Sequence, residues 1–255
     1  MPSWNAEQYL RFADERTRPC RDLVAALALV KPRRIVDLGC GPGSSAAVLA
    51  QRWPAATIVG LDSSEAMIAA AREKDPAGTW VVGDIATWED DAAYDLVFSN
   101  AALHWVADHA AVFPRLLSRV AAGGALAVQM PYNLDAPAQQ AMREIARRPE
   151  WRGRLGDVRT WHVEPAATYY DLLSPLAARV DIWVTEYVHV LPDAAAIVAW
   201  YRGSGLRPYL DRLPDPDERE RFLAEYLAAI TAAHPAQRDG RVLLLFRRLF
   251  VVAYR

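Results

Sequence analysis

The fold of this chain is decided by the stretch Arg33-Arg34-Ile35-Val36-Asp37-Leu38-Gly39-Cys40-Gly41-Pro42-Gly43. Its first four residues have strand character, and residues 44–52 carry the apolar pattern of a helix. A strand with an acid near its end, then G-x-G-x-G, then a helix is how an α/β fold holds a nucleoside-containing cofactor, because glycine lets the backbone turn tightly and approach the ligand. The spacing differs from the G-x-G-x-x-G of dinucleotide-binding folds. Three glycines alone would also suit an ordinary strand-to-helix turn.

The strand-like runs that follow decide between these two interpretations. Thr57–Asp62 ends in an acid, and an acid at the end of the second strand can accept two hydrogen bonds from a ribose diol. Trp80–Asp84 ends in another acid, and Tyr94–Asn100 ends in a polar amide. Because four strand ends at β-α-β intervals each carry a suitable group, an isolated turn is a poor explanation, and a cofactor site is predicted.

Length and composition narrow the class of protein. The chain has 255 residues and is 53% apolar, which suits one large domain or a core with an insertion. Its net charge of −2 argues against non-specific electrostatic binding of nucleic acid. No signal peptide or apolar run of membrane-spanning length is evident, and the cysteines are Cys20 and Cys40 alone. We expect a reduced, cytoplasmic protein without nucleic-acid or membrane partners and without a cysteine-based metal site.

One helix is predicted before the first of these strands, and the others are each predicted after a strand. Alternating strands and helices indicate a doubly wound sheet of parallel strands with helices on both faces. Ser63 and Ser64 are candidate N-caps of the helix that follows the second strand. The predicted helices span residues 19–30, 44–52, 64–74 and 108–120, and a fifth, buried strand spans residues 125–130.

After Pro131 the alternation stops. The sheet of the class I methyltransferases, which the glycine loop resembles, ends with an antiparallel pair. This resemblance implies the same pair for the chain's last two strands, with the helices around them forming a mainly helical lid. The predicted elements are helices at 136–148, 166–173, 193–201 and 217–233, a loop at 150–160, and strands at 180–191 and 242–254. The expected organisation is an N-terminal segment over the cleft (1–30), an α/β core that binds the cofactor (31–131), lid insertions (132–178 and 192–241) and final core strands (179–191 and 242–255).

The glycine loop resembles motif I of the class I S-adenosylmethionine (SAM) methyltransferases. A resemblance to one family within that class, the trans-aconitate 2-methyltransferases, extends over nearly the whole chain. It rests on Trp4-Asn5, Tyr9–Phe12, Glu15–Pro19, Gln51–Ala55, Asp62–Ser64, His104-Trp105, Gln129–Pro131, Tyr169–Asp171, Val180–Trp183, Gly205–Pro208 and Arg248–Phe250. Residues 132–135 and 149–163 fit the family pattern less well.

This resemblance implies a site for SAM that uses no metal. Asp37 is expected to brace the glycine loop more than to touch the ligand. Asp62 is assigned to the ribose, and Asp84 with Ile85 to the adenine. The implied cofactor-binding residues are Asp37, Gly39, Cys40, Gly41, Pro42, Asp62, Ser63, Met67, Asp84, Ile85 and Asn100.

On the acceptor side, the resemblance implies methylation of a carboxylate of trans-aconitate, a small polycarboxylate, to a monomethyl ester and S-adenosylhomocysteine. His104, four residues past Asn100, is the expected catalytic residue, with a core histidine as the alternative. A tricarboxylate calls for arginines, whose planar fork pairs with carboxylate, although each arginine here could instead be solvated. The aromatic candidates could equally pack in the core. The implied substrate-binding residues are Tyr9, Phe12, Arg16, Arg18, His104, Trp105, Gln129, Tyr169, Tyr170 and Arg207.

A carboxylate is already ionised at neutral pH, so the predicted reaction needs no general base and depends on orientation. Two alternatives stay open from the sequence. One is a SAM-dependent enzyme that acts on another organic acid or a hydroxyl compound. The other is a SAM-binding module without turnover. The sequence predicts no particular oligomeric state.

Overall fold

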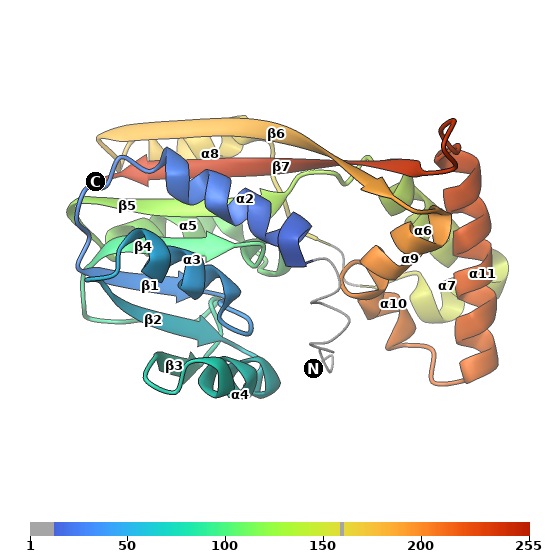
Figure 1. Ribbon diagram of the computed structural model, residues 1–255, viewed down its shortest axis with the longest axis horizontal. Coiled ribbons are helices and arrows are strands. Elements are labelled where there is room, and N and C mark those ends of the chain that lie inside the picture. Colours follow the sequence, from blue (N-terminus) through green and yellow to red (C-terminus); the bar gives the residue numbers. More distant parts are fainter. Residues whose placement is uncertain (1–12, 159–160) are drawn as a thin grey trace. The chain divides into compact units, whose positions relative to one another are not determined.

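The computed structural model describes residues 13–158 and 161–255. A seven-stranded sheet with the strand order β3-β2-β1-β4-β5-β7-β6 organises the chain (Figure 1). The order reverses between β1 and β4, and β1 to β5 are parallel, while β7 runs antiparallel to β5. The doubly wound sheet predicted from the sequence is confirmed. The strands are β1 (Arg34–Leu38), β2 (Thr57–Asp62), β3 (Thr79–Val82), β4 (Tyr94–Asn100), β5 (Val120–Pro131), β6 (Arg179–Leu191) and β7 (Val242–Tyr254).

The chain divides into two compact units, which we call the core unit and the helical unit. The core unit contains Ala13–Pro131, His162–Thr185 and Arg248–Arg255. Within it, α2 and α3 lie on one face of the sheet, and α5 and α8 on the other (Figure 1). Its helices are α2 (Ala13–Ala26), α3 (Ser44–Arg52), α4 (Glu65–Lys74), the short 3-10 helix η1 (Leu103–Trp105), α5 (His109–Ser118) and α8 (Ala166–Leu173).

The described part of the helical unit contains residues 132–158, Trp161 and Glu186–Arg247. Its longest helix, α11, packs against α6 and α9. The helices are α6 (Pro137–Ala146), α7 (Pro149–Leu155), α9 (Ala194–Arg202), α10 (Arg207–Leu210) and α11 (Pro216–Ala233). The sequence analysis places α8 in the lid, whereas α8 belongs to the core unit. A lid function for the helical unit stays a prediction.

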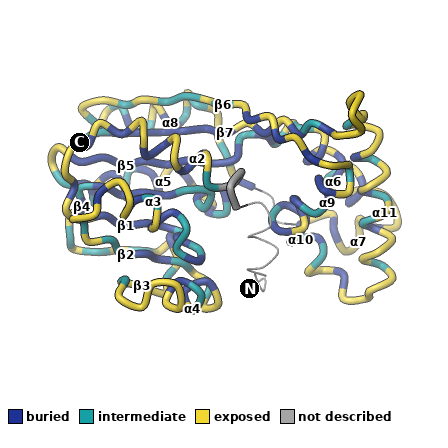
Figure 2. The backbone as a smooth tube through the Cα atoms, viewed as in Figure 1, coloured by how far each residue is buried: buried dark blue, intermediate teal, exposed yellow. Residues whose placement is uncertain are grey.

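The hydrophobic core of the core unit follows its central strands. Figure 2 shows β1, β4 and β5 buried along most of their length. Val36, Val97 and Leu126, one from each of these strands, are 0% exposed. Near-continuous burial is what a parallel sheet with helices on both faces requires. The carboxyl ends of β1, β4 and β5 therefore extend from a well-buried core.

Two local predictions are wrong. Residues 150–160 were expected to form a loop, but α7 occupies Pro149–Leu155. A proline at the first helical turn and two apolar side chains four residues apart, Trp151 and Leu155, stabilise this helix, and both apolar side chains are buried. The first helix was expected at 19–30, yet α2 spans Ala13–Ala26 with Pro19 inside it. The short helix α10 was not predicted.

Candidate active site

The glycine loop after β1 carries three residues with positive φ: Gly39 (76°), Gly41 (54°) and Gly43 (81°). The loop is tied to the neighbouring strand, because the N–H groups of Gly39 and Cys40 donate to the Leu61 carbonyl at 2.7 and 3.0 Å. A Cβ on Gly39 would overlap the Cβ of Ala102, a residue that follows β4. A Cβ on Gly41 would meet nothing within 4 Å. The loop thus packs closely against the residue that follows β4 at Gly39, and it has free space beside Gly41.

Asp37 braces the helix that follows this loop. Its side chain is 0% exposed, and its Oδ2 accepts a hydrogen bond from Ser45 Oγ at 2.5 Å. Burial raises the pKa of Asp37 to about 7, and the nearby Asp62 adds to the rise, while hydrogen bonds from Ser45 and the Ala46 backbone oppose it. These bonds reach the first turn of α3, and the expected bracing of the glycine loop itself stays a prediction. Direct contact of Asp37 with a cofactor stays a prediction.

Asp62 links the end of β2 to the glycine loop. Its Oδ2 accepts from the Gly41 N–H and its Oδ1 from the Ser64 N–H, both at 2.9 Å. Each carboxylate oxygen has a further acceptor position, so these bonds orient the group and leave it able to accept two hydroxyl donors. Ser64 caps α4 by accepting from the Met67 N–H at 3.4 Å, and Met67 is buried. Ser63, the other candidate cap, is exposed.

The two residues after β3 that were assigned to adenine differ in their surroundings. Asp84 is exposed, and its Oδ1 accepts from the Ala86 N–H at 2.9 Å, which closes a local turn. Ile85 is buried, and its Cδ1 lies 3.4 Å from the position of a Cβ on Gly39. Ile85 therefore lies beside the glycine loop, as an adenine wall would, while Asp84 faces solvent.

The segment after β4 carries the expected catalytic histidine. It begins with Ala101 in the left-handed region at φ 54°, whose N–H donates to the Gln129 carbonyl at 2.9 Å. A non-glycine residue in this region is strained, and such strain persists only where the surroundings hold it. His104 is 3% exposed, its carbonyl accepts from the His162 N–H at 2.8 Å, and its ring lies 5.0 Å from that of Trp105. The histidine is therefore held at the carboxyl end of β4.

A second histidine, which the sequence analysis did not select, supports this segment. His109 Nε2 lies 3.0 Å from the Leu103 carbonyl, so this nitrogen carries the proton in the neutral ring. His109 Nδ1 then accepts from the Tyr169 hydroxyl at 2.8 Å, and that hydroxyl accepts from the Glu164 N–H at 2.9 Å. Burial lowers the pKa of His109, which favours this neutral form. A chain of hydrogen bonds thus joins α8 to the turn that contains His104.

The aromatic and amide candidates for substrate binding have different surroundings. Tyr169 is 0% exposed, which fits the alternative that it packs in the core, whereas Tyr170 is 54% exposed. Trp105 is half-buried beside His104. Gln129 is 0% exposed at the end of β5. Tyr9 and Phe12 lie outside the described residues.

The three arginine candidates are not brought together in one unit. Arg18 is exposed on α2, and Arg16 contributes its backbone to the same helix. Arg207 begins α10 in the helical unit and lies 3.8 Å from Asp211 in an ion pair. Their assignment to the acceptor's carboxylates stays a prediction.

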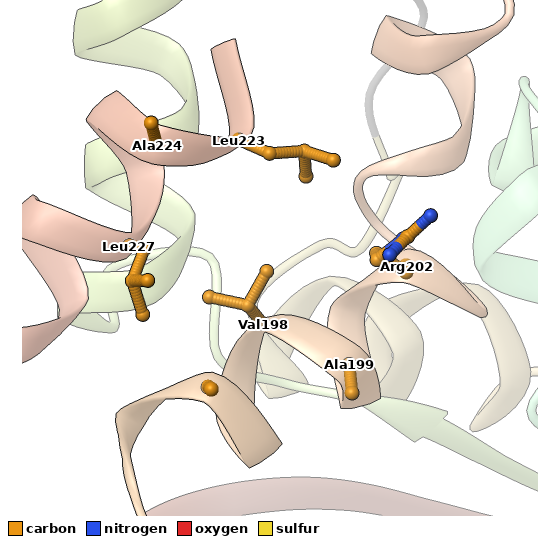
Figure 3. A pocket seen from close by; sticks show the side chains of 7 residues that line it. Val198, Ala199, Arg202, Leu223, Ala224 and Leu227 are labelled. Carbon is orange, nitrogen blue, oxygen red and sulfur yellow. The ribbon is translucent and has the colours of Figure 1, made fainter. Parts of the chain in front are cut away.

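A groove within the helical unit does not match this chemistry. It lies between α9 and α11 and has a volume of about 250 Å³. Figure 3 shows its walls, where Arg202 is the charged side chain and the others are aliphatic. A polycarboxylate buried there would lack partners for most of its charge. The aliphatic lining residues are Ala195, Val198, Ala199, Leu223, Ala224 and Leu227.

Comparison with known proteins identifies the family. A family model described as a methyltransferase domain matches residues 35–124. The trans-aconitate 2-methyltransferase of Rhodopseudomonas palustris (strain BisB18) is 50% identical over 258 residues, covering 100% of both chains. The protein of that name from Variovorax paradoxus (strain S110) is 49% identical and covers 100% of this chain and 99% of its own.

The chain belongs to the trans-aconitate 2-methyltransferase family. Membership makes it a SAM-dependent methyltransferase, so the family and the cofactor predicted from the sequence are confirmed. Solved structures agree at the level of the fold. The YcgJ protein from Bacillus subtilis is 14% identical, with a TM-score of 0.61 over 93% of this chain and 99% of its own. A Haemonchus contortus phosphoethanolamine N-methyltransferase, solved with SAM, is 18% identical with a TM-score of 0.56 over 93% of this chain and 52% of its own.

Within residues 13–158 and 161–255, no helix is both long enough and apolar enough to cross a membrane. No group of three or more His, Cys, Asp or Glu side chains in the same described part is arranged to hold a metal ion.

Proposed function

We propose that this trans-aconitate 2-methyltransferase family member transfers the methyl group of SAM to a carboxylate of trans-aconitate, giving a monomethyl ester and S-adenosylhomocysteine. The observation that carries the proposal is the extent of the similarity. Proteins with this name are about half identical to the chain and align with it from end to end, so the similarity includes the helical unit as well as the core unit. If only the SAM-binding core were shared, the similarity would not extend over the helical unit.

The residues of the core unit suit SAM. Gly41 leaves open space at the loop, and Asp62 is held by Gly41 and Ser64 in a position to accept from ribose hydroxyls. Asn100 Oδ1 is buried without a hydrogen-bond partner among the described residues, so it is a candidate acceptor for the amino group of the methionine moiety. When bound, SAM supplies an electrophilic methyl group on a sulfonium. The chain's own task is to hold that group and the acceptor in line.

The acceptor needs no deprotonation, because a carboxylic acid with a pKa near 4 is ionised at neutral pH. We assign His104 the role of a hydrogen-bond donor that orients the acceptor. The hydrogen bonds from His109 to Leu103 and from His162 to His104 hold the turn, so its side chain starts from a fixed backbone. Well-oriented reactants can gain roughly 7–11 kcal/mol of the barrier. Orientation and exclusion of water would therefore supply most of the acceleration.

Initial rates with a panel of di- and tricarboxylates test the proposal. We expect trans-aconitate to have the highest kcat/KM, with cis-aconitate, citrate and monocarboxylates well below it. The rate on trans-aconitate should stay flat from about pH 6.5 to pH 8.5, because no base has to titrate. A hydroxyl compound as the best acceptor would refute the carboxylate assignment. A rise of kcat with a single ionisation near pH 7, with chemistry shown to limit the rate, would make His104 a base.

A further inference from the structure

Two side-chain amides lie next to each other where β4 and β5 end. Asn100 and Gln129 are register partners across these parallel strands, so their side chains project from the same face of the sheet. Gln129 is 0% exposed, and neither its Oε1 nor its Nε2 has a hydrogen-bond partner among the described residues. The Oδ1 of Asn100 is also buried without such a partner. Both amides therefore have unused hydrogen-bonding capacity.

An unpartnered glutamine is a poor choice for stability in this position. Its neighbours on the same face, Ala127 two residues earlier on β5 and its register partner Phe250 on β7, are apolar and 0% exposed. A buried polar group without a partner costs free energy that an apolar side chain of the same shape would not. The burial of Gln129 thus calls for an explanation, and the carboxyl ends of the strands are where an α/β sheet binds its ligands.

A buried positive charge lies on the same face. Phe250 of β7 is the register partner of Gln129, and Arg248 is the partner of Pro131, two residues further toward the carboxyl end of β5. Residues two apart along a strand share a face, so Arg248 projects with Phe250 and Gln129. Arg248 is 5% exposed. Residues on diagonal positions of adjacent strands are close enough for long side chains to reach a common ligand.

The backbone joins this face to the expected catalytic turn. The Gln129 carbonyl accepts from the Ala101 N–H at 2.9 Å, and Ala101 starts the segment that carries His104. The Gln129 amide and the histidine turn therefore lie at neighbouring strand ends, and Arg248 lies within β7 opposite the end of β5, all in one compact unit.

We propose that Gln129 and Arg248 form the subsite that holds a carboxylate of the acceptor. The Gln129 Nε2 donates a hydrogen bond to a carboxylate oxygen, and the Arg248 guanidinium supplies the compensating charge. An uncharged donor suits a nucleophilic carboxylate, because it orients the group and withdraws less charge than a second cation would. The inference rests on the proposed function, and it assigns part of the acceptor recognition to the core unit, apart from Arg16, Arg18 and Arg207.

The test is Gln129→Met, which keeps the length of the side chain and removes both polar atoms. A hydrogen bond to a charged group corresponds to about a ten- to hundredfold change in affinity. We expect KM for trans-aconitate to rise by that factor, with SAM affinity within about twofold of wild type by calorimetry. The melting temperature should stay the same or rise, since the free protein loses no hydrogen bond. Gln140→Met is the matched control, because Gln140 is an exposed glutamine on α6, and its KM should not change.

Equilibrium binding of the acid to the protein saturated with S-adenosylhomocysteine separates the subsite from the reaction. If wild type binds trans-aconitate without methylating it, and Gln129→Met abolishes binding, the proposed function fails and the subsite stands. If Gln129→Met lowers the melting temperature and leaves acid binding intact, the amide is structural and the inference is overturned. Wild-type protein that neither binds nor methylates the acid overturns both. Arg248→Lys, which keeps the charge without the planar fork, should weaken acid binding partially and leave SAM binding unchanged.

Discussion

The buried Tyr169 hydroxyl gives the sharpest mutational prediction. The sequence allowed two roles for this residue, a wall of the substrate pocket or a part of the core. In the structure its hydroxyl donates to His109 Nδ1 at 2.8 Å and accepts from the Glu164 N–H at 2.9 Å, and its ring centroid lies 4.7 Å from that of Phe113. Tyr169→Phe removes the two hydrogen bonds and keeps the ring.

The expected loss of stability follows from the groups left behind. His109 Nδ1 is left without a partner in the core, and an unsatisfied buried group costs about 1–3 kcal/mol. Glu164 is exposed, so its N–H can bond to water instead, and we expect a loss of about 1–3 kcal/mol in the free energy of unfolding. For a chain of this size that corresponds to a fall in melting temperature of about 2–12 °C.

Urea denaturation and thermal melting followed by circular dichroism measure this loss. Tyr170→Phe is the matched control, because Tyr170 is the next residue and is 54% exposed, and its stability should match wild type. Tyr169→Phe should also lower kcat more than it raises KM, because the His109 ring that holds the Leu103 carbonyl loses its anchor. Wild-type stability together with a raised KM in Tyr169→Phe would refute the core role and return Tyr169 to the pocket wall.

Two further substitutions test the SAM site, and a third tests the buried carboxylate of Asp37. Gly39→Ala should abolish SAM binding and lower the melting temperature, because the new Cβ overlaps Ala102 and the residue has φ 76°; a variant that binds SAM normally would show that the loop can move away. Asp62→Ala removes an acceptor of two ribose hydroxyls and should weaken SAM binding at least about tenfold by calorimetry while the fold survives; unchanged affinity would take Asp62 out of the site. The pKa of Asp37 is raised to about 7 in the folded protein and is near 3.9 when unfolded, so the folded state binds the proton more tightly and stability should fall as pH rises from about 4 to about 7. Asp37→Asn should flatten this fall in urea titrations, and an unaltered pH dependence would contradict the raised pKa.

The sequence predicted the strands of the sheet because their signals are local. An apolar run that ends in a polar residue, then a helix, repeats along the first half of the chain, and β2 and β4 have the predicted bounds. The signal was weaker for α7, where Gly153 and two arginines, Arg152 and Arg154, interrupt the apolar pattern. The spacing of Trp151 and Leu155 could still have revealed that helix.

The supporting contacts of the site depend on residues far apart in the sequence. His109 and Tyr169 are separated by 60 positions, and nothing local to either one indicates that they share a hydrogen bond. Gly39 was selected for its place in the motif, but its overlap with Ala102 is visible only once β1 and β4 are paired. Register likewise gives Gln129 and Arg248 a common face, although the sequence separates them widely.

The arginine predictions show that composition alone identifies anion-binding residues poorly in this chain. Nearly all basic residues of the chain are arginines, so the residue type alone does not mark an anion site. Burial discriminates better among the described arginines, because Arg18 is exposed while Arg248 is 5% exposed. Burial and the register that places Arg248 on the same face as Gln129 single it out, whereas residue type and a position beside a proline do not.

The fate of the methyl group tests the central claim most directly. The purified protein is incubated with SAM labelled in its methyl group and with trans-aconitate, and the products are separated and identified by mass spectrometry and nuclear magnetic resonance. The account predicts that the label appears in a monomethyl ester of the acid, in equal amount to the S-adenosylhomocysteine formed. Label in any other product, or S-adenosylhomocysteine formed without the ester, would contradict it.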